Sequence, residues 1–203
     1  MRAAATLSTL VDRLHLGLAV GLALALTGCW LPDRYRADIE ITPVMVNTHF
    51  SGRLTNLELY RQMRDRQGSA AAAANAQDMS EMERELRGDP NIKSVKQVGM
   101  ATFQVTFDVA HPTRVANDIL SILTFAPKGR RLTLKSAQYS QADAEFFHKN
   151  YDLESSGDVC VTTTLKVIRH NADRGQGNGS PCYFWHLDLN NPRAIEIEIE
   201  LPG

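Results

Sequence analysis

The sequence predicts an α+β fold, in which a mostly antiparallel β-sheet carries about two helices. Apolar and polar residues alternate along several segments, which is the period of a strand with one buried face. The alternation is clearest over 103–108 and 195–200. Turns rich in Gly, Pro and Asn separate these segments, whereas only two stretches carry helix signals. No internal repeat divides the chain, so we expect one domain with the helices packed against the sheet.

The expected strands follow from this alternation. Gly52 predicts a bulge in the second strand, and His111-Pro112 is expected to end the fourth. In the last strand the isoleucines should point inward and Glu196, Glu198 and Glu200 outward, as a solvated face or a surface for a basic partner. The strands are expected over 35–41, 46–60, 92–98, 102–109, 119–125, 131–137, 159–168, 183–189 and 195–201.

Two helices are expected between the strands. The alanine-rich segment 70–86 has high helix propensity, and Gly88-Asp89-Pro90 should stop it. A shorter helix is expected over 141–149.

The N-terminus has the layout of a lipoprotein signal peptide. Basic residues and a short apolar run precede Leu26-Thr27-Gly28-Cys29. That run is shorter than the roughly 20 residues that span a bilayer. The four residues resemble the lipobox of bacterial lipoproteins, in which the cysteine receives diacylglycerol and becomes the first residue after cleavage. The alternative is an ordinary secretory signal with a coincidental cysteine.

This interpretation divides the chain into three parts. Residues 1–28 are the signal peptide, 29–34 the lipidated cysteine and a short tether, and 35–203 a single periplasm-facing domain. The tether holds the domain against the membrane, where Arg34 and Arg36 could meet anionic head groups. In diderm bacteria a residue other than Asp after the cysteine directs a lipoprotein to the outer membrane, and Trp30 fits that rule.

Charge and cysteine content limit the function classes further. The chain without its signal peptide has an excess of about two acidic residues. It therefore lacks the net positive charge that is typical of nucleic-acid-binding proteins. Two cysteines remain after lipidation, Cys160 and Cys182. In an oxidising envelope they either form a disulfide or stay as separate buried thiols, and their spacing decides neither.

Several segments resemble a known family. They are Cys29–Pro32, Leu86–Pro90, Phe103–Val105, 161–172 and Tyr183–Asp188, and together they resemble small proteobacterial envelope lipoproteins. The last third also resembles LppM-type lipoprotein domains. The second resemblance implies a compact β-rich body that can hold an amphiphile, and it supplies no catalytic residues.

The chain carries no recognisable catalytic motif. The glycine-rich segment 175–179 has no helix after it, so a flexible hairpin loop is favoured over a phosphate-binding loop. His170, Asn171, Asp173 and His186 could form a metal or acid–base cluster, but polar residues at loop ends that bond their own backbone are favoured. We therefore expect no catalytic residue, metal or cofactor.

Three functions remain from the sequence. The favoured one is a membrane-anchored, non-catalytic module that binds a lipid, an amphiphile or an envelope partner. The second is a structural accessory lipoprotein of an envelope complex, and the third, less favoured, is a hydrolytic enzyme. A deep apolar cavity would support the first, a flat exposed apolar patch the second, and converging acids and bases in a cleft the third. The sequence leaves the oligomeric state open.

Overall fold

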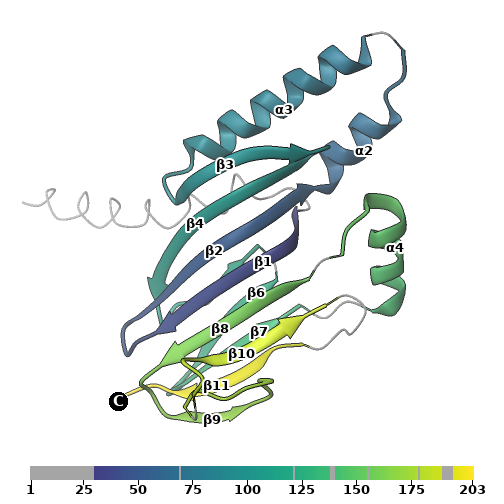
Figure 1. The fold of residues 1–203 in the computed structure, drawn as a ribbon. Helices are drawn as coiled ribbons and strands as arrows, with labels where there is room; N and C mark the ends of the chain where they lie inside the picture. Colours follow the sequence, from purple (N-terminus) through teal and green to yellow (C-terminus); the bar gives the residue numbers. More distant parts are fainter. Residues whose placement is uncertain are drawn as a thin grey trace, which may run out of the picture.

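The computed structural model describes residues 30–203 except 69, 121, 138–139, 155, 178 and 189–193. Its two mostly antiparallel sheets and its helices confirm the expected α+β class (Figure 1). The lipobox residues Leu26, Thr27, Gly28 and Cys29 lie outside the described residues, so the lipidation site stays a prediction.

The larger sheet, sheet A, has six strands in the order β10-β8-β1-β2-β4-β3. Its neighbours pair antiparallel except β1 and β8, which run parallel. Its strands are β1 (Trp30–Ile41), β2 (Met45–Asn56), β3 (Ile92–Gly99), β4 (Thr102–Pro112), β8 (Gly157–Thr163) and β10 (Tyr183–Leu187).

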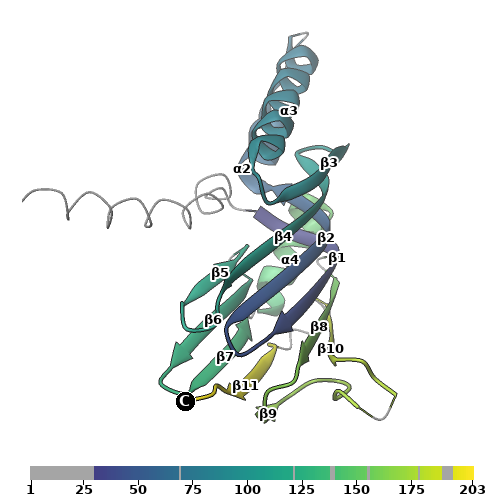
Figure 2. The ribbon, with the colours of Figure 1, turned by 90° about the vertical axis from the view of Figure 1, so that its left-hand side faces the viewer.

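The smaller sheet, sheet B, has five strands in the order β5-β6-β7-β11-β9 and lies beside sheet A (Figure 2). Its strands are β5 (Asn117–Ile119), β6 (Leu123–Lys128), β7 (Arg131–Ser136), β9 (Val167–His170) and β11 (Glu196–Glu200). One apolar cluster holds the buried side chains of both sheets. His111 of β4 meets Phe125 of β6 edge-on at 4.9 Å between ring centres, so the two sheets share one core.

The described residues form three helices rather than two. They are α2 (Leu57–Asp65), α3 (Ala71–Gly88) and α4 (Gln141–Tyr151). The expected second strand ends at Asn56, because the Asn56 side chain accepts from the Leu59 amide and caps α2. The helix α3 packs on β3, and α4 begins with a capping box of Ser140 and Asp143 (Figure 1).

Other expected strand limits also change. His111-Pro112 does not end β4. The strand pairs with β2 as far as Pro112, which lies opposite Met45. The expected strand 159–168 is two strands, since the chain leaves sheet A after Thr163 and enters sheet B at Val167. Composition could not show this change, because both parts are rich in Val and Thr.

The first strand begins at Trp30, which removes most of the expected tether 29–34. Trp30 and Leu31 are buried and pair with Asn56 and Thr55 at the end of β2. Proline has no N–H to donate to a neighbouring strand. Pro32 is tolerated in β1 because β8 pairs with β1 only from Tyr35 onward, so no strand on that side requires a donor from residue 32. The folded body therefore starts one residue after Cys29.

A bulge in β1 explains why this start was missed. The register with β2 shifts between Asp33 and Arg36, and Arg34 has a positive φ of 48°. The extra residue changes which positions face inward, so the alternation seen from Tyr35 onward does not continue upstream. The bulge expected at Gly52 thus lies in the opposite strand.

Gly52 gives the space that this bulge requires. A Cβ on Gly52 would lie 2.3 Å from the Tyr35 Cβ, and one on Gly157 would lie 2.3 Å from the Tyr35 ring. Tyr35 is buried and stacks on Phe50 at 5.6 Å between ring centres. Two glycines, on β2 and β8, therefore leave room for one tyrosine of the strand between them.

We predict that Gly52→Ala destabilises the protein by about 1–3 kcal/mol, because the new methyl group overlaps Tyr35. Gly88→Ala is the control, since nothing lies within 4 Å of the added Cβ, and it should change stability by less than about 1 kcal/mol. Urea unfolding followed by circular dichroism measures both. Equal effects from the two substitutions would contradict the close packing around Tyr35.

The strand β11 corrects the expected solvated glutamate face. It lies between β7 and β9, so it is not an edge strand. Glu198 is buried and accepts from Arg131 at 2.8 Å and Arg169 at 2.7 Å. Glu196 and Glu200 pair with basic side chains of neighbouring strands as well. The three carboxylates therefore meet cations of the same chain.

The Glu198 contacts predict a pH dependence of stability. The hydrogen bonds from Arg169 and Arg131 hold the pKa of Glu198 below its ordinary value of 4.5. The ionised form is thus favoured in the folded state, and its contribution is present above pH 4.5 and lost as pH falls through the lowered pKa. Glu198→Gln should make the thermal midpoint less sensitive to pH below 4.5. Glu85→Gln on α3 is the control and should keep the wild-type profile.

Candidate binding face of sheet A

The outer face of sheet A carries a row of polar side chains in register. Asp38 of β1 lies opposite both His49 of β2 and Cys160 of β8, and His49 lies opposite Asp108 of β4. The His49 Nδ1 is 2.6 Å from the Asp108 carboxylate. These positions alternate with the buried inner residues of the same strands, which is why they point to the other side.

One hollow on this face lies over the C-terminal part of β1, the N-terminal part of β2 and the C-terminal part of β4. It has a volume of about 550 Å³. Asp38, Glu40 and Asp108 give it an acidic character, with His49 among them. We call it the strand hollow. Asn47 donates to Glu40 at 3.3 Å and holds one carboxylate in place.

The second hollow adjoins it at Cys160 and has a volume of about 620 Å³. It is lined by Arg36, Arg174, Phe184 and the loop residues 175–177 and 179–182, so its charged side chains are basic. We call it the loop hollow. The Arg174 guanidinium lies 4.4 Å from the centre of the Phe184 ring, a cation–π contact that sets its position.

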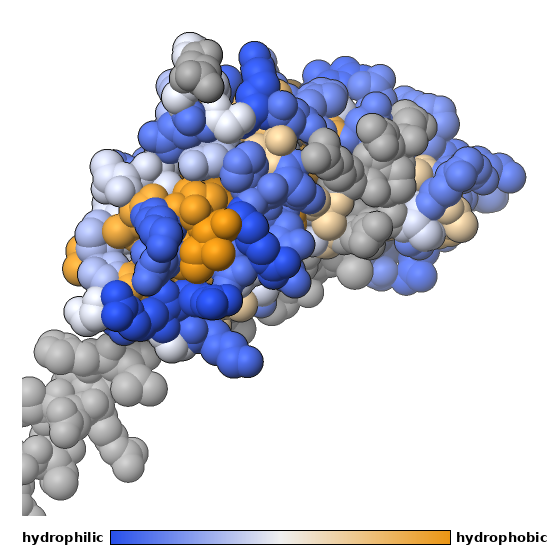
Figure 3. Space-filling view, turned by 90° about the horizontal axis from the view of Figure 1, so that it is seen from below, coloured by the Kyte–Doolittle hydropathy of each residue, from blue (hydrophilic) through white to orange (hydrophobic). Residues whose placement is uncertain are grey.

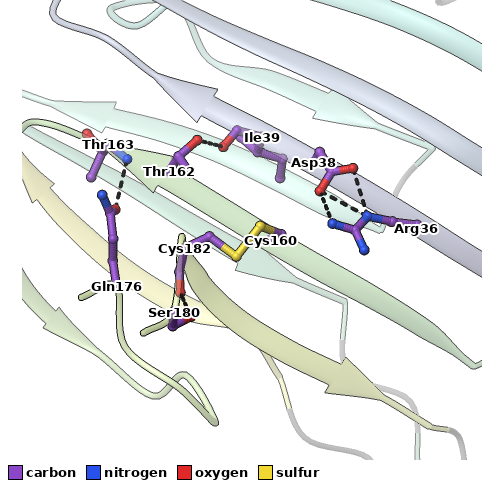
Figure 4. Close-up of a disulfide and its surroundings, with 9 residues drawn as sticks. All are labelled: Arg36, Asp38, Ile39, Cys160, Thr162, Thr163, Gln176, Ser180 and Cys182. Carbon is purple, nitrogen blue, oxygen red and sulfur yellow. Dashed lines mark hydrogen bonds and ion pairs between the residues drawn. A yellow bond between two sulfur atoms is a disulfide. The ribbon is translucent and has the colours of Figure 1, made fainter. Parts of the chain in front are cut away.

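A disulfide between Cys160 and Cys182 fastens this loop to the sheet (Figure 4). Gln176 accepts from the Thr163 amide at 3.2 Å, and the Ser180 hydroxyl donates to the Cys182 carbonyl at 2.7 Å. Of the two alternatives left by the sequence, the structure thus has the bonded pair. Because β8 and β10 pair Cys160 with Phe184, Cys182 lies close enough to bond diagonally.

We predict that alkylation under denaturing, non-reducing conditions modifies neither Cys160 nor Cys182 in protein taken from the envelope. The bond closes a loop across 22 residues of sequence, so reduction should lower the unfolding free energy by about 3 kcal/mol. Mass spectrometry counts the alkylated thiols. Two labelled thiols before reduction would contradict the bond.

The two arginines expected to face the membrane are already paired. Arg34 meets Glu154 at 3.0 Å, and that hydrogen bond and charge raise the pKa of Arg34. Arg36 meets Asp38 at 2.8 Å and lines the loop hollow (Figure 4). Their contact with head groups stays a prediction, but carboxylates of the same chain already compensate both charges.

The residues weighed as a metal or acid–base cluster have separate structural contacts. The His186 Nδ1 is 2.7 Å from Asp158, and the His186 amide donates to Asp173. His170 accepts from the Ala172 amide at 3.2 Å, as a loop residue bonding its own backbone. The Asn171 side chain accepts from Trp185 at 2.9 Å. Across the described ranges, no three His, Cys, Asp or Glu side chains are grouped to hold a metal ion.

The remaining histidines differ in burial. The side chains of His49 and Asp108 are 52% and 51% exposed, so water reaches their contact freely. His111 is buried between the sheets, its Nδ1 lies 3.1 Å from the Pro112 carbonyl, and burial lowers its pKa. Neither arrangement resembles a water-excluded catalytic pair.

Sequence reasoning missed most of this face. Asp38, Glu40, His49 and Asp108 were assigned only to the polar side of strands or to no site. Their alternation was visible, but which strands are neighbours depends on the parallel β1–β8 pairing across the length of the chain. The missing information was therefore strand order.

The end of the molecule near the β1–β2 turn and the C-terminus has a different surface. Seen from below, it presents an apolar area surrounded by hydrophilic residues (Figure 3). Val44 in the β1–β2 turn is 68% exposed, and Val115, just after β4, is 51% exposed. The Thr113 amide donates to the Val44 carbonyl, which holds the two loops together.

Comparison with solved structures finds a distant structural neighbour. The chain is similar to the NMR structure of the folded domain of Mycobacterium tuberculosis LppM, with 12% identity and a TM-score of 0.43, over 84% of this chain and 91% of that chain. No family model and no curated protein matches the sequence. Among the described helices, none is long and apolar enough to cross a membrane.

Proposed function

We propose that the protein is a lipid-anchored lipoprotein of the bacterial envelope whose folded body is a non-catalytic binding module. The observation that carries the binding role is the pair of adjoining hollows on the outer face of sheet A. Binding residues are typically placed on loops held by a rigid scaffold, and here a disulfide holds the loop 174–182 on a six-stranded sheet.

The lining of the hollows favours a polar partner over an acyl chain. The loop hollow presents Arg174 and the strand hollow presents Glu40, in addition to the paired Arg36 and Asp38, and the two hollows meet at Cys160. A segment that crosses both would satisfy them with an acidic group followed by a basic one. An extended, charged stretch of an envelope protein has this chemistry, so we favour an envelope partner over an amphiphile.

The lipid anchor supplies the location. Leu26-Thr27-Gly28-Cys29 is the lipobox, the lipid is attached to Cys29, and Trp30 directs the protein to the periplasmic face of the outer membrane. Two or three acyl chains are enough for stable anchoring. The body then presents its hollows to partners from a fixed membrane position.

Site-specific photo-crosslinking in cells tests the binding face. We predict that a photoreactive residue at Glu40, in the strand hollow, gives a discrete protein adduct. The same residue at Lys96, exposed on β3 of the same sheet, is the matched control and should give none. Arg174→Ala should weaken the Glu40 adduct if the partner spans both hollows. Equal adducts from Glu40 and Lys96 would contradict the proposal.

The apolar area at the end of the molecule favours a second function, that of a structural accessory protein of an envelope complex. Exposed apolar patches mark protein–protein contacts, and Val44 and Val115 are exposed apolar side chains in the two loops joined by the Thr113–Val44 hydrogen bond. A photoreactive residue at Val115 distinguishes the two functions. An adduct from Val115 and none from Glu40 would favour the accessory role.

A further inference from the structure

Four aromatic side chains form a partly exposed cluster between α2 and α4. Tyr60 of α2 meets Tyr151 of α4 edge-on at 5.1 Å between ring centres, and Phe146 and Phe147 contact Tyr151 at 6.0 and 6.4 Å. Phe146 is 53% exposed, an unusual position for so large an apolar ring. We call these four residues the aromatic cluster.

Short connections hold the aromatic cluster next to the first residue of β1. Trp30 lies opposite Asn56, which caps α2, and Tyr60 follows four residues later, about 6 Å along the helix. The segment after α4 is tied to the same place, because the Tyr35 amide donates to the Ser156 carbonyl and Glu154 pairs with Arg34. Cys29 is one residue before Trp30, at most about 3.8 Å away.

We propose that the aromatic cluster is a membrane-docking surface that seats the folded body on the lipid bilayer beside its own anchor. The proposal rests on lipidation of Cys29, which places the bilayer at this end of the molecule. Aromatic rings with a polar edge, such as Tyr60 and Tyr151, are enriched at the level of lipid head groups. Phe146 is the ring that enters the apolar boundary.

The cations of α2 and β1 near the aromatic cluster are compensated, and on α4 the exposed Lys149 is outnumbered by Asp143 and Glu145, so we expect insertion of rings rather than electrostatic attraction. On α2, Arg61 pairs with Glu58 at 2.8 Å and Arg64 with Asp65 at 3.2 Å. Arg34 is paired with Glu154, as described above. These compensated cations give little attraction to anionic lipids. Docking should therefore depend weakly on salt, which differs from the expectation based on Arg34 and Arg36.

The strand hollow and the loop hollow lie on sheet A, at a distance from the aromatic cluster. Asp38 is eight residues along β1 from Trp30, roughly 25 Å at the rise of a strand. Docking through the aromatic cluster thus keeps the strand hollow at a distance from the bilayer surface.

Photolabelling of the full lipidated chain in vesicles tests the proposal. Vesicles of phosphatidylethanolamine and phosphatidylglycerol carry a lipid with a photoreactive group near the head group, and labelled peptides are mapped by mass spectrometry. We expect labels concentrated in α4, retained at about 0.5 M salt, where screening leaves a Debye length of only a few ångströms. Labels spread evenly over the body, no label on α4, or labelling lost at high salt would overturn it.

Matched variants keep the test specific. Phe146→Ser should lower α4 labelling about fivefold, because roughly half of a phenylalanine side chain loses its burial in lipid. Phe146→Trp should retain the labelling. Val115→Ser is the control, since Val115 is equally exposed at the opposite end, and it should change nothing. Equal labelling in Phe146→Ser and wild type would also overturn the proposal.

Radioactive palmitate incorporation is measured on the same samples. Absence of palmitate would contradict the lipid anchor of the proposed function. Presence of palmitate without labels on α4 would contradict only the docking surface, so the two failures are distinguishable.

Discussion

The pairing of β1 with both β2 and β8 is the constraint on which the rest of the structure depends. It joins the N-terminal strands β2, β4 and β3 to the C-terminal strands β8 and β10 in one sheet. Because β1 and β8 are parallel, both begin at the same end of the sheet. The chain between them must therefore return to that end before β8 can begin. The sheet-B strands β5, β6 and β7 and the helix α4 all lie within that return.

The position of Tyr35 makes this pairing specific. Its Cβ lies against Gly52 of β2 and its ring against Gly157 of β8, so a side chain added at either glycine would overlap it. It continues inward to Phe50 and Phe107, which stack at 4.7 Å between ring centres. The bulge at Arg34 allows Trp30 and Tyr35 both to be buried although five positions separate them. A one-residue slip of β1 would lose these contacts together.

The two surfaces that matter for function follow from the direction of β1. Its first residue pairs with Asn56, the cap of the helix that carries Tyr60, and its second half carries Asp38 and Glu40 in the strand hollow. One strand thus connects the proposed membrane contact to the proposed partner contact. The disulfide adds the loop hollow by holding the segment after β9 against the outer face of β8.

Sequence patterns predicted the parts of this structure that depend on local periodicity. The hairpin of β3 and β4, the inward isoleucines of β11 and the helix α4 were expected near their observed limits. The misses have specific physical causes. A bulge before Tyr35 shifts the alternation of buried and exposed residues in β1. The Val- and Thr-rich segment 159–168 contributes one strand to each sheet. Asn56 as a helix cap, followed by Leu59 and Met63 on one helix face, is a sequence signal for α2. It was missed because the second strand was expected to continue to residue 60.

The binding face was not predictable in the same way, since its residues come from β1, β2, β4 and β8. Only β1 and β2 form a local hairpin, whereas the pairing of β2 with β4 and of β1 with β8 is long-range. The contacts of Glu198 likewise needed the order of β7, β11 and β9. Each side chain was visible in the sequence as the polar half of an alternating strand. Its neighbours across the sheet were not.

Hydrogen–deuterium exchange of the full lipidated chain tests the central claim most directly. The claim is that the folded body begins at Trp30, with no tether between Cys29 and β1. The account predicts that the Leu31 and Asp33 amides exchange slowly, on the timescale of the amides over 37–41, because all of them belong to one paired strand. Complete exchange of Leu31 and Asp33 within seconds, with 37–41 still protected, would show a flexible tether and contradict the account.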